Sequence, residues 1–251
     1  TLLILSFVVL SSGCDSDGYS CSSEGCYAEN NAQYLTLEDC LSVCDEVDPN
    51  SAVFESCGDQ IGHEGYNYST VQIGNQCWFA ENCRYLPVVS PSSAGSETYP
   101  YYYVYGYEGS TVSEAQATAN YATYGVLYNY AAVMTEGICP SGWHIPSDEE
   151  FTQLTDFLGG EGVAGGKMKE AGYDHWNSPN EGATNSSGWT GLPGGYRSSG
   201  GFDYNGNYGY WRSASESDSV SWERGLFDFI EDVYRGNLNR NGGFSARCVQ
   251  D

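Results

Sequence analysis

The sequence predicts an α+β fold with few helices, twisted antiparallel strands and long loops. Three observations favour this class. The 251-residue chain contains 32 glycines and 22 tyrosines, a composition typical of many turns and many exposed rings. Residues 66–79 have the alternation and the central Gly-Asn turn of a β-hairpin. Only residues 147–158 carry a clear helical pattern, so helices are expected to be a minority.

The charge balance excludes several function classes. The chain has 33 acidic and 9 basic residues, a formal net charge of −24. Binding to nucleic acid or to anionic lipid needs clustered Lys and Arg, so neither partner is expected. The first basic residue is Arg84, which makes the N-terminal third a strongly anionic tract.

Residues 1–13 are expected to be a signal peptide of the lipoprotein type, incomplete at its N-terminus because the chain starts with Thr1. Its apolar core, residues 2–10, is too short to span a bilayer. The string Leu-Ser-Ser-Gly-Cys that ends at Cys14 resembles a lipobox, which implies acylation of Cys14 and a lipidated tether over residues 14–20. The alternative is an ordinary secretory signal whose Cys14 joins a disulfide.

The expected location is the outer membrane or cell surface of a Gram-negative bacterium, with the lipid as the only membrane contact. Asp15 and Asp17 directly follow Cys14 and resemble the surface-export signals of Bacteroidetes-type lipoproteins. Ten cysteines also fit an oxidising compartment, where disulfides persist.

Residues 21–45 are expected to form a small cysteine-rich module. Its four cysteines predict a two-disulfide staple that joins Cys21 and Cys26 with Cys40 and Cys44, since the segment has too little apolar mass for a core of its own. The segment resembles the second half of a Kunitz inhibitor, but the inhibitory loop has no counterpart. Residues 46–52 are charged, contain proline and read as a linker to a main domain over residues 53–251.

Within the main domain, the hairpin at 66–79 is followed by a Ser-, Gly- and Tyr-rich stretch, residues 87–119, that predicts a long surface loop. Residues 124–133 are apolar and fit either a strand or a helix. The helix at 147–158 begins with a capping box of Ser147 and Glu150. A last apolar strand is expected at 244–249.

Several strings along the main domain together resemble the Fibrobacter succinogenes major paralogous domain, over about residues 55–251. That resemblance implies a C-type lectin-like fold related to formylglycine-generating enzymes, on extracytoplasmic bacterial proteins. The sequence departs from the pattern at Cys83, where leucine is usual, and at His63-Glu64-Gly65. The matching strings are Tyr68-x-Thr70-Val71-x-Ile73-Gly74-x-Gln76-Cys77-Trp78-x-Ala80-Glu81-Asn82, Tyr124-Gly125-x-Leu127-Tyr128-Asn129, Cys139-Pro140-x-Gly142-Trp143-His144-Ile145-Pro146-Ser147-Asp148-x-Glu150-Phe151, Leu192-Pro193-Gly194-Gly195-x-Arg197, Gly209-Tyr210-Trp211-x-Ser213 and Arg247-Cys248-Val249.

The resemblance implies that the ends of the domain meet. A Cys139–Cys248 disulfide would then join the start of the helix to the last strand. By restricting the unfolded chain, it would stabilise the fold by about 4–5 kcal/mol. Cys57–Cys77 is the second expected pair. Cys83 is left either as a buried thiol or as a competitor for Cys77.

The sequence gives little support for catalysis, and no enzyme is expected. His63, His144 and His175 lack metal-ligand spacing, and His144 is expected to be a structural hydrogen-bonding group. The Gly-x-Gly-x-x-Gly string at residues 160–165 follows a helix, which excludes a dinucleotide site. A glycosidase-type carboxylate pair remains an alternative, although no spacing singles one out.

Residues 202–211 are the expected ligand site, because rings stack on sugar C–H faces while amides and carboxylates bind hydroxyls. The alternative is a glycine-rich turn with Trp211 in the core. A second aromatic stretch, residues 99–107, is either a stacking surface or a loop that covers a sheet. The candidate ligand-binding residues are Arg197, Asp203, Tyr204, Asn205, Asn207, Tyr208 and Tyr210.

Calcium is a possible cofactor, because the oxygen ligands of Asp203, Asn205 and Asn207 alternate along the chain. The preferred function is a surface-anchored lipoprotein whose lectin-like domain recognises polysaccharide or glycoprotein. The alternatives are an envelope protein that docks a partner without a sugar ligand, and an extracytoplasmic enzyme on the same scaffold.

Overall fold

The computed structural model describes residues 19–22, 25–28, 54–199 and 201–251, and the chain divides into two units, residues 1–52 and 53–251. In the first unit, strands β1 (Tyr19–Ser22) and β2 (Gly25–Ala28) pair antiparallel. The leader, Cys14, Cys40 and Cys44 lie outside the described residues. Lipidation of Cys14 and the disulfides of the cysteine-rich module therefore stay predictions.

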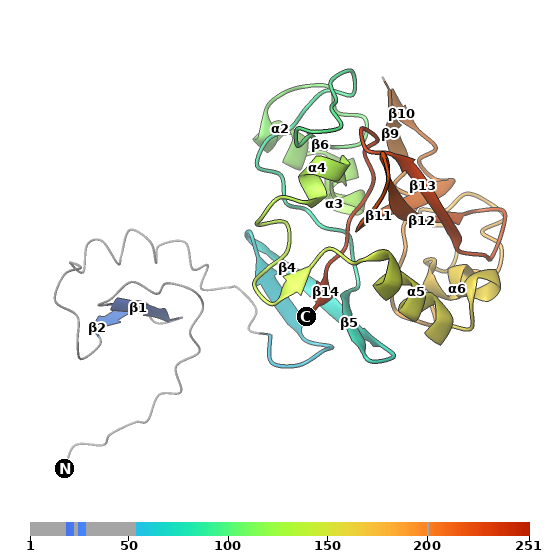
Figure 1. Ribbon diagram of the computed structural model, residues 1–251, viewed down its shortest axis with the longest axis horizontal. Helices are drawn as coiled ribbons and strands as arrows, with labels where there is room; N and C mark the ends of the chain where they lie inside the picture. The colour runs from blue at the N-terminus through green and yellow to red at the C-terminus, as the bar shows by residue number, and fades with distance from the viewer. Residues whose placement is uncertain (1–18, 23–24, 29–53, 200) are drawn as a thin grey trace, which may run out of the picture. The chain divides into compact units, whose positions relative to one another are not determined.

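The second unit is built mostly from antiparallel sheets with few helices, as the α+β prediction requires. Its five-stranded sheet has the order β3-β4-β5-β14-β8, and Figure 1 labels β4, β5 and β14 of this sheet. The predicted hairpin at 66–79 is confirmed as β4 (Tyr66–Ile73) and β5 (Gln76–Phe79). The last strand, β14 (Val249–Gln250), lies between β5 and β8 (Trp143–His144), so the end of the described chain closes the sheet that β3 (Gln60–His63) begins.

Two disulfides tie this sheet to the segments around it. Cys57–Cys77 and Cys139–Cys248 are both formed, as the resemblance implied. Cys83 is a buried free thiol whose Sγ lies 3.5 Å from Sγ of Cys248, so it does not compete for Cys77.

The predicted helix is confirmed as α5 (Asp148–Phe157), with both halves of the Ser147–Glu150 capping box in place. It is followed by α6 (Glu161–Met168), which the sequence analysis did not predict. In α5, Phe151 and Leu154 are fully buried in a core that also contains Trp211. This core joins the two helices to a three-stranded sheet.

The three-stranded sheet consists of β11 (Tyr208–Ser217), β12 (Val220–Phe227) and β13 (Tyr234–Asn239), all antiparallel. The short hairpin β9 (Tyr196–Ser198) and β10 (Gly201–Asp203) precedes it. Figure 1 shows β9 and β10 at one end of this sheet and α5 and α6 at the other. None of these strands was predicted, and they carry the candidate site.

The prediction of a surface loop at 87–119 is wrong. The segment contains β6 (Tyr102–Tyr103) and α2 (Val112–Gln116), and α3 (Ala119–Tyr124) begins at its end. Tyr102 and Tyr103 are buried, because β6 pairs with β7 (Leu127–Tyr128). The apolar run at 124–133 forms β7 and then α4 (Tyr130–Val133), and thus both a strand and a helix.

The predicted strand at 244–249 is also wrong in its extent, since β14 starts only at Val249. The backbone groups of the preceding residues form hydrogen bonds with several different segments. Ser245 exchanges backbone hydrogen bonds with β11, whereas the carbonyl of Ala246 accepts from the Cys83 N–H. An apolar segment can thus be buried without forming a continuous ladder, because its backbone groups find separate partners.

Candidate functional site

One face of the three-stranded sheet is covered by aromatic rings. Tyr208 lies opposite Phe227, and Gly225 lies opposite both Tyr210 and Tyr234. Opposite residues of paired strands share a side of the sheet, so the four rings lie on one side. Three rings from neighbouring segments contact them. The resulting aromatic face consists of Tyr196, Tyr204, Tyr208, Tyr210, Phe227, Phe229 and Tyr234.

Two glycines on the same side of the sheet leave space for these rings. A Cβ atom on Gly225 would lie 2.9 Å from the Tyr210 ring and 3.0 Å from the Phe227 ring. A Cβ atom on Gly236 would overlap the ring of Tyr234. A larger residue at either position would displace the rings, so glycine there is required by close packing.

The rings stack on one another and still reach solvent. Tyr204 lies parallel to Tyr208, with 4.4 Å between centroids and 2° between planes, and Phe227 lies parallel to Phe229 at 5.6 Å. The carbonyl of Tyr204 accepts hydrogen bonds from the backbone N–H groups of Asn207 and Tyr208, which fixes its turn. Tyr204 is 50% exposed, Phe229 53% and Tyr234 43%. A contiguous group of exposed rings of this kind is typical of an interaction site.

A polar rim borders the aromatic face. The amide of Asn207 donates to Oδ2 of Asp228 at 2.6 Å, and the amide of Asn177 donates to Oδ1 of Asn207 at 3.1 Å. Asp228 lies between Phe227 and Phe229 in the chain, so this rim adjoins the rings, and because Asp228 is only 6% exposed it mainly orients the Asn207 amide. Amide and carboxylate groups beside aromatic rings supply both the apolar and the hydrogen-bonding contacts that a sugar needs.

A pocket of about 400 Å³ adjoins the aromatic face, with which it shares Tyr196 and Tyr210. It lies between β9 and the segment that follows β13. Its remaining lining contains hydroxyl, amide and apolar groups and one arginine, and comprises Arg197, Ser198, Ser199, Leu238, Asn239, Asn241, Gly242 and Phe244.

The structure brings four of the predicted ligand residues together, namely Tyr204, Asn207, Tyr208 and Tyr210. Arg197 is a correction, because its side chain is only 2% exposed. Its guanidinium donates to the backbone carbonyls of Ser92, Ala94 and Asn241 at 2.8–2.9 Å. These bonds join distant loops, so Arg197 shapes the wall of the pocket and is not a free ligand contact.

Sequence reasoning missed several residues of the site. Phe227, Asp228 and Phe229 come from the end of β12, and Asn177 comes from a distant loop. The string Phe-Asp-Phe at 227–229 alternates apolar and polar character and could have indicated a strand end with rings on one side. Nothing in the sequence links Asn177 to Asn207.

The candidate calcium ligands are each engaged with a different segment. Asp203 accepts from the Ser198 hydroxyl at 3.0 Å, and the amide of Asn205 donates to the Pro193 carbonyl at 3.3 Å. Asn207 belongs to the polar rim. Across the described part of the chain, no group of three or more His, Cys, Asp or Glu side chains could hold a metal ion.

Two buried charges lie on the same side of the sheet as the aromatic face. Glu223 of β12 pairs with Arg212 of β11, next to the pair of Tyr210 and Gly225, and both side chains are fully buried. Burial raises the pKa of Glu223 and lowers the pKa of Arg212. Neither carboxylate oxygen of Glu223 has a hydrogen-bond partner among the described residues, which leaves a buried acid close to the site.

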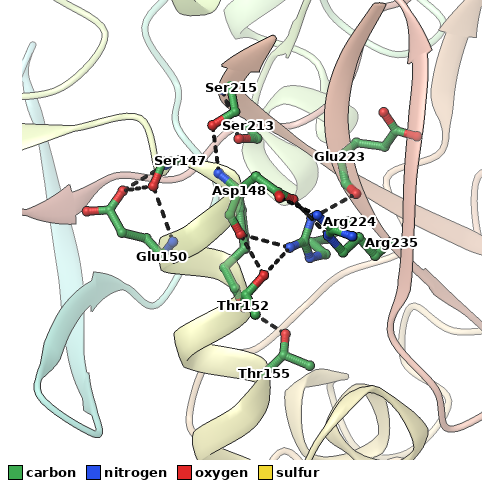
Figure 2. Close-up of polar contacts among 11 residues, drawn as sticks. Ser147, Asp148, Glu150, Thr152, Thr155, Ser213, Ser215, Glu223, Arg224 and Arg235 are labelled. Carbon is green, nitrogen blue, oxygen red and sulfur yellow. Dashed lines mark hydrogen bonds and ion pairs between the residues drawn. The ribbon is translucent and has the colours of Figure 1, made fainter. Parts of the chain in front are cut away.

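The opposite side of the sheet is anchored to α5 through Asp148 (Figure 2). Its carboxylate accepts from Arg224 at 2.7 Å and from Arg235 at 2.6 Å, and its backbone N–H donates to Ser215 at 2.9 Å. Partial burial raises the pKa of Asp148, but the bonds from Arg235 and Arg224 outweigh it and hold that pKa below its ordinary value. This network ties the sheet to α5 on the side away from the aromatic face.

His144 and Cys83 are both held in structural positions. Both ring nitrogens of His144 are bonded, Nδ1 to Asp251 at 2.6 Å and Nε2 to Glu150 at 2.7 Å. Partial burial lowers the pKa of His144, but these bonds raise it overall. Burial raises the pKa of the Cys83 thiol to about 12, which keeps it protonated.

In the segments that the structure describes, no helix has the length and apolar character to cross a bilayer.

Comparison with known proteins identifies a family. The sequence model of the Fibrobacter succinogenes major domain matches residues 71–250, which include all strands of the aromatic face. No curated protein matches the chain. No solved structure matches it either.

Proposed function

We propose that this chain, which belongs to the Fibrobacter succinogenes major domain family, is a polysaccharide-binding module that acts outside the cytoplasm. The observation that carries the proposal is the aromatic face itself, whose stacked rings are up to 53% exposed and adjoin the rim of Asn177, Asn207 and Asp228.

The physical basis is the two-sided chemistry of a sugar ring. Its apolar C–H face packs on an aromatic ring, while its hydroxyl groups form hydrogen bonds with amides and carboxylates in the plane of the ring. The stacked pairs Tyr204–Tyr208 and Phe227–Phe229 are already ordered, so binding a rigid chain would cost little side-chain entropy.

The scaffold is proposed to be C-type lectin-like. Its support is the mostly antiparallel architecture, the closure of the five-stranded sheet by β14 and the Cys139–Cys248 disulfide. In such a fold a stable sheet carries irregular segments, and variation of those segments changes the ligand. The location is proposed to be the cell surface, through a lipid on Cys14. If a Cys14→Ala variant still partitions with membranes, lipidation at this residue is wrong.

Binding is tested by retention of the purified chain on insoluble polysaccharides and by a glycan array, with calcium and with chelator. We expect retention by at least one polysaccharide, and weaker retention of Tyr204→Ala and Phe229→Ala. The control is Phe157→Ala, because Phe157 is 65% exposed on α5 and contacts Gly74 of the β4–β5 turn, outside the aromatic face.

Each truncated ring should weaken binding by about 0.5–1.5 kcal/mol, or roughly two- to tenfold. Equal retention of all four proteins would show that the ligand binds elsewhere. If neither an insoluble polysaccharide nor a glycan of the array were bound, the exposed rings would be better explained as a docking site for a partner protein.

A further inference from the structure

The nine basic residues of the chain all lie in its described part, and none is left free to bind an anion. Five are almost fully buried, at 0–2% exposure: Lys169, Arg197, Arg212, Arg224 and Arg247. The ammonium of Lys169, for example, donates to the backbone carbonyls of Glu181, Phe227 and Ile230 at 2.7–2.8 Å.

Of the four remaining basic residues, three form ion pairs and the fourth, Lys167, donates to a backbone carbonyl away from the aromatic face. Arg84 lies 3.6 Å from the carboxylate of Glu81, and Arg235 lies 2.6 Å from that of Asp148. Arg240, beside the pocket residues Asn239 and Asn241, lies 3.1 Å from the carboxylate of Glu216. The ammonium of Lys167 donates to the Leu158 carbonyl at 2.6 Å, at the end of α5.

The surroundings of the aromatic face are acidic. Asp228 belongs to the polar rim, and the exposed Asp232 lies in the short segment that joins Phe229 to Tyr234. In the pocket, the only charged lining residue is Arg197, whose guanidinium is hydrogen-bonded to three backbone carbonyls.

From this distribution of charge we infer that the ligand of the aromatic face and its pocket is a neutral polysaccharide, and that acidic polysaccharides are excluded. The inference rests on the proposed function and names the ligand class of the same site. An acidic polymer would bring carboxylates or sulfates close to Asp228 and Asp232, where no free cation is available to pair with them. Like charges at a contact cost binding free energy, and an unpaired charge removed from water costs more.

The groups that do line the site suit an uncharged sugar. The hydroxyls of Ser198 and Ser199 and the amides of Asn239 and Asn241 donate and accept hydrogen bonds without a net charge. Tyr196 and Tyr210 connect this pocket to the rings outside it, so that a chain lying on the aromatic face could place one sugar or branch in the pocket.

The test compares matched polymers. Cellulose, starch, xylan and dextran are each offered in unmodified, hydroxyethylated and carboxymethylated forms at equal substitution, and the bound fraction of the full chain is measured. We expect the carboxymethylated form to bind at least about tenfold more weakly than the hydroxyethylated form of the same polymer, with part of the difference lost at high salt. The hydroxyethylated form controls for the loss of sugar hydroxyls.

A charge variant separates repulsion from steric effects. In Asp232→Lys, binding to the carboxymethylated polymer should rise several-fold, while binding to the unmodified polymer stays the same. Equal binding of neutral and carboxymethylated forms by the native chain would overturn the inference and leave the proposed function standing. Absence of binding to every polymer in every form would overturn the proposed function and the inference with it.

Discussion

The two sides of the three-stranded sheet are formed by the same strands but differ in exposure and in the contacts that they make. On the inner side, Trp211 and Leu226 are fully buried, and Arg224 reaches Asp148 of α5. On the outer side, Tyr208 and Tyr210 lie in the aromatic face. Because side chains alternate along a strand, Tyr208 and Tyr210 of β11 lie on the outer side and Trp211 on the inner side.

The difference shows where stability and recognition are separated in this molecule. The inner side uses apolar burial and a network of ion pairs, which hold the sheet against α5. On the outer side the aromatic rings are partly exposed. They contribute less to the free energy of folding than the inner side chains do, because much of their area stays in water. Substitutions on the two sides should therefore have separable effects on unfolding and on binding.

The largest effect is expected from Trp211→Ala. Trp211 is fully buried, its indole N–H donates to Asn82 at 2.8 Å, and its ring packs against Trp189 at 4.7 Å. Removal of the ring should cost about 4 kcal/mol of the free energy of unfolding, measured by urea denaturation. A loss no larger than that of Phe229→Ala would contradict the assignment of the inner side as the structural one.

Asp148→Asn should cost about 3 kcal/mol, because the substitution leaves the buried guanidinium of Arg224 without its carboxylate partner. Glu149→Gln is the matched control, since Glu149 is the neighbouring carboxylate and is exposed. Both variants, once folded, should bind polysaccharide as the native chain does. A large effect in the control would show that the net charge of the helix start matters more than the ion pair.

The two sides should also respond to pH in opposite directions. The lowered pKa of Asp148 stabilises the fold above its ordinary value of 3.8, and this contribution is lost as the pH falls through the folded value. The raised pKa of Glu223 has the opposite effect. Its contribution is fully present below its ordinary value of 4.5 and is lost as the pH rises through the folded value.

Denaturation of the native chain, Asp148→Asn and Glu223→Gln at several pH values measures both effects. Each group contributes a slope of at most about 1.4 kcal/mol per pH unit. Glu223→Gln should remove the decline on the alkaline side, and Asp148→Asn the decline on the acid side. If both variants retained the native slopes, other groups would control the pH dependence.

The smallest effect on folding is expected from Phe229→Ala on the outer side. Phe229 is 53% exposed, so its removal should cost less than about 1 kcal/mol of unfolding free energy. Loss of glycan binding at unchanged stability would sharpen the contrast between the two sides. A large loss of stability would mean that its stacking on Phe227 holds the turn in place.

The sequence alone predicted the local elements that carry strong local signals. The hairpin at 66–79 has alternation and a Gly-Asn turn, and α5 has a capping box, a turn of acidic residues and an apolar stripe. The general α+β class and the two disulfide pairings, which came from the resemblance, are also present. In the candidate site, the string around Tyr204, Tyr208 and Tyr210 pointed to the right segment.

Tertiary structure alone decided what those residues face. Arg197 looked like a ligand contact, yet its bonds to the carbonyls of Ser92 and Ala94 bury it, across more than a hundred positions of sequence. Phe229 and Asn177 reach the site only because β12 and a remote loop are brought beside β11. Composition and local pattern fix turns, caps and alternation, because these depend on neighbours in the chain. Which side of a strand is buried, and which cations stay free, depends on contacts between distant segments, and those appear only when the chain is folded.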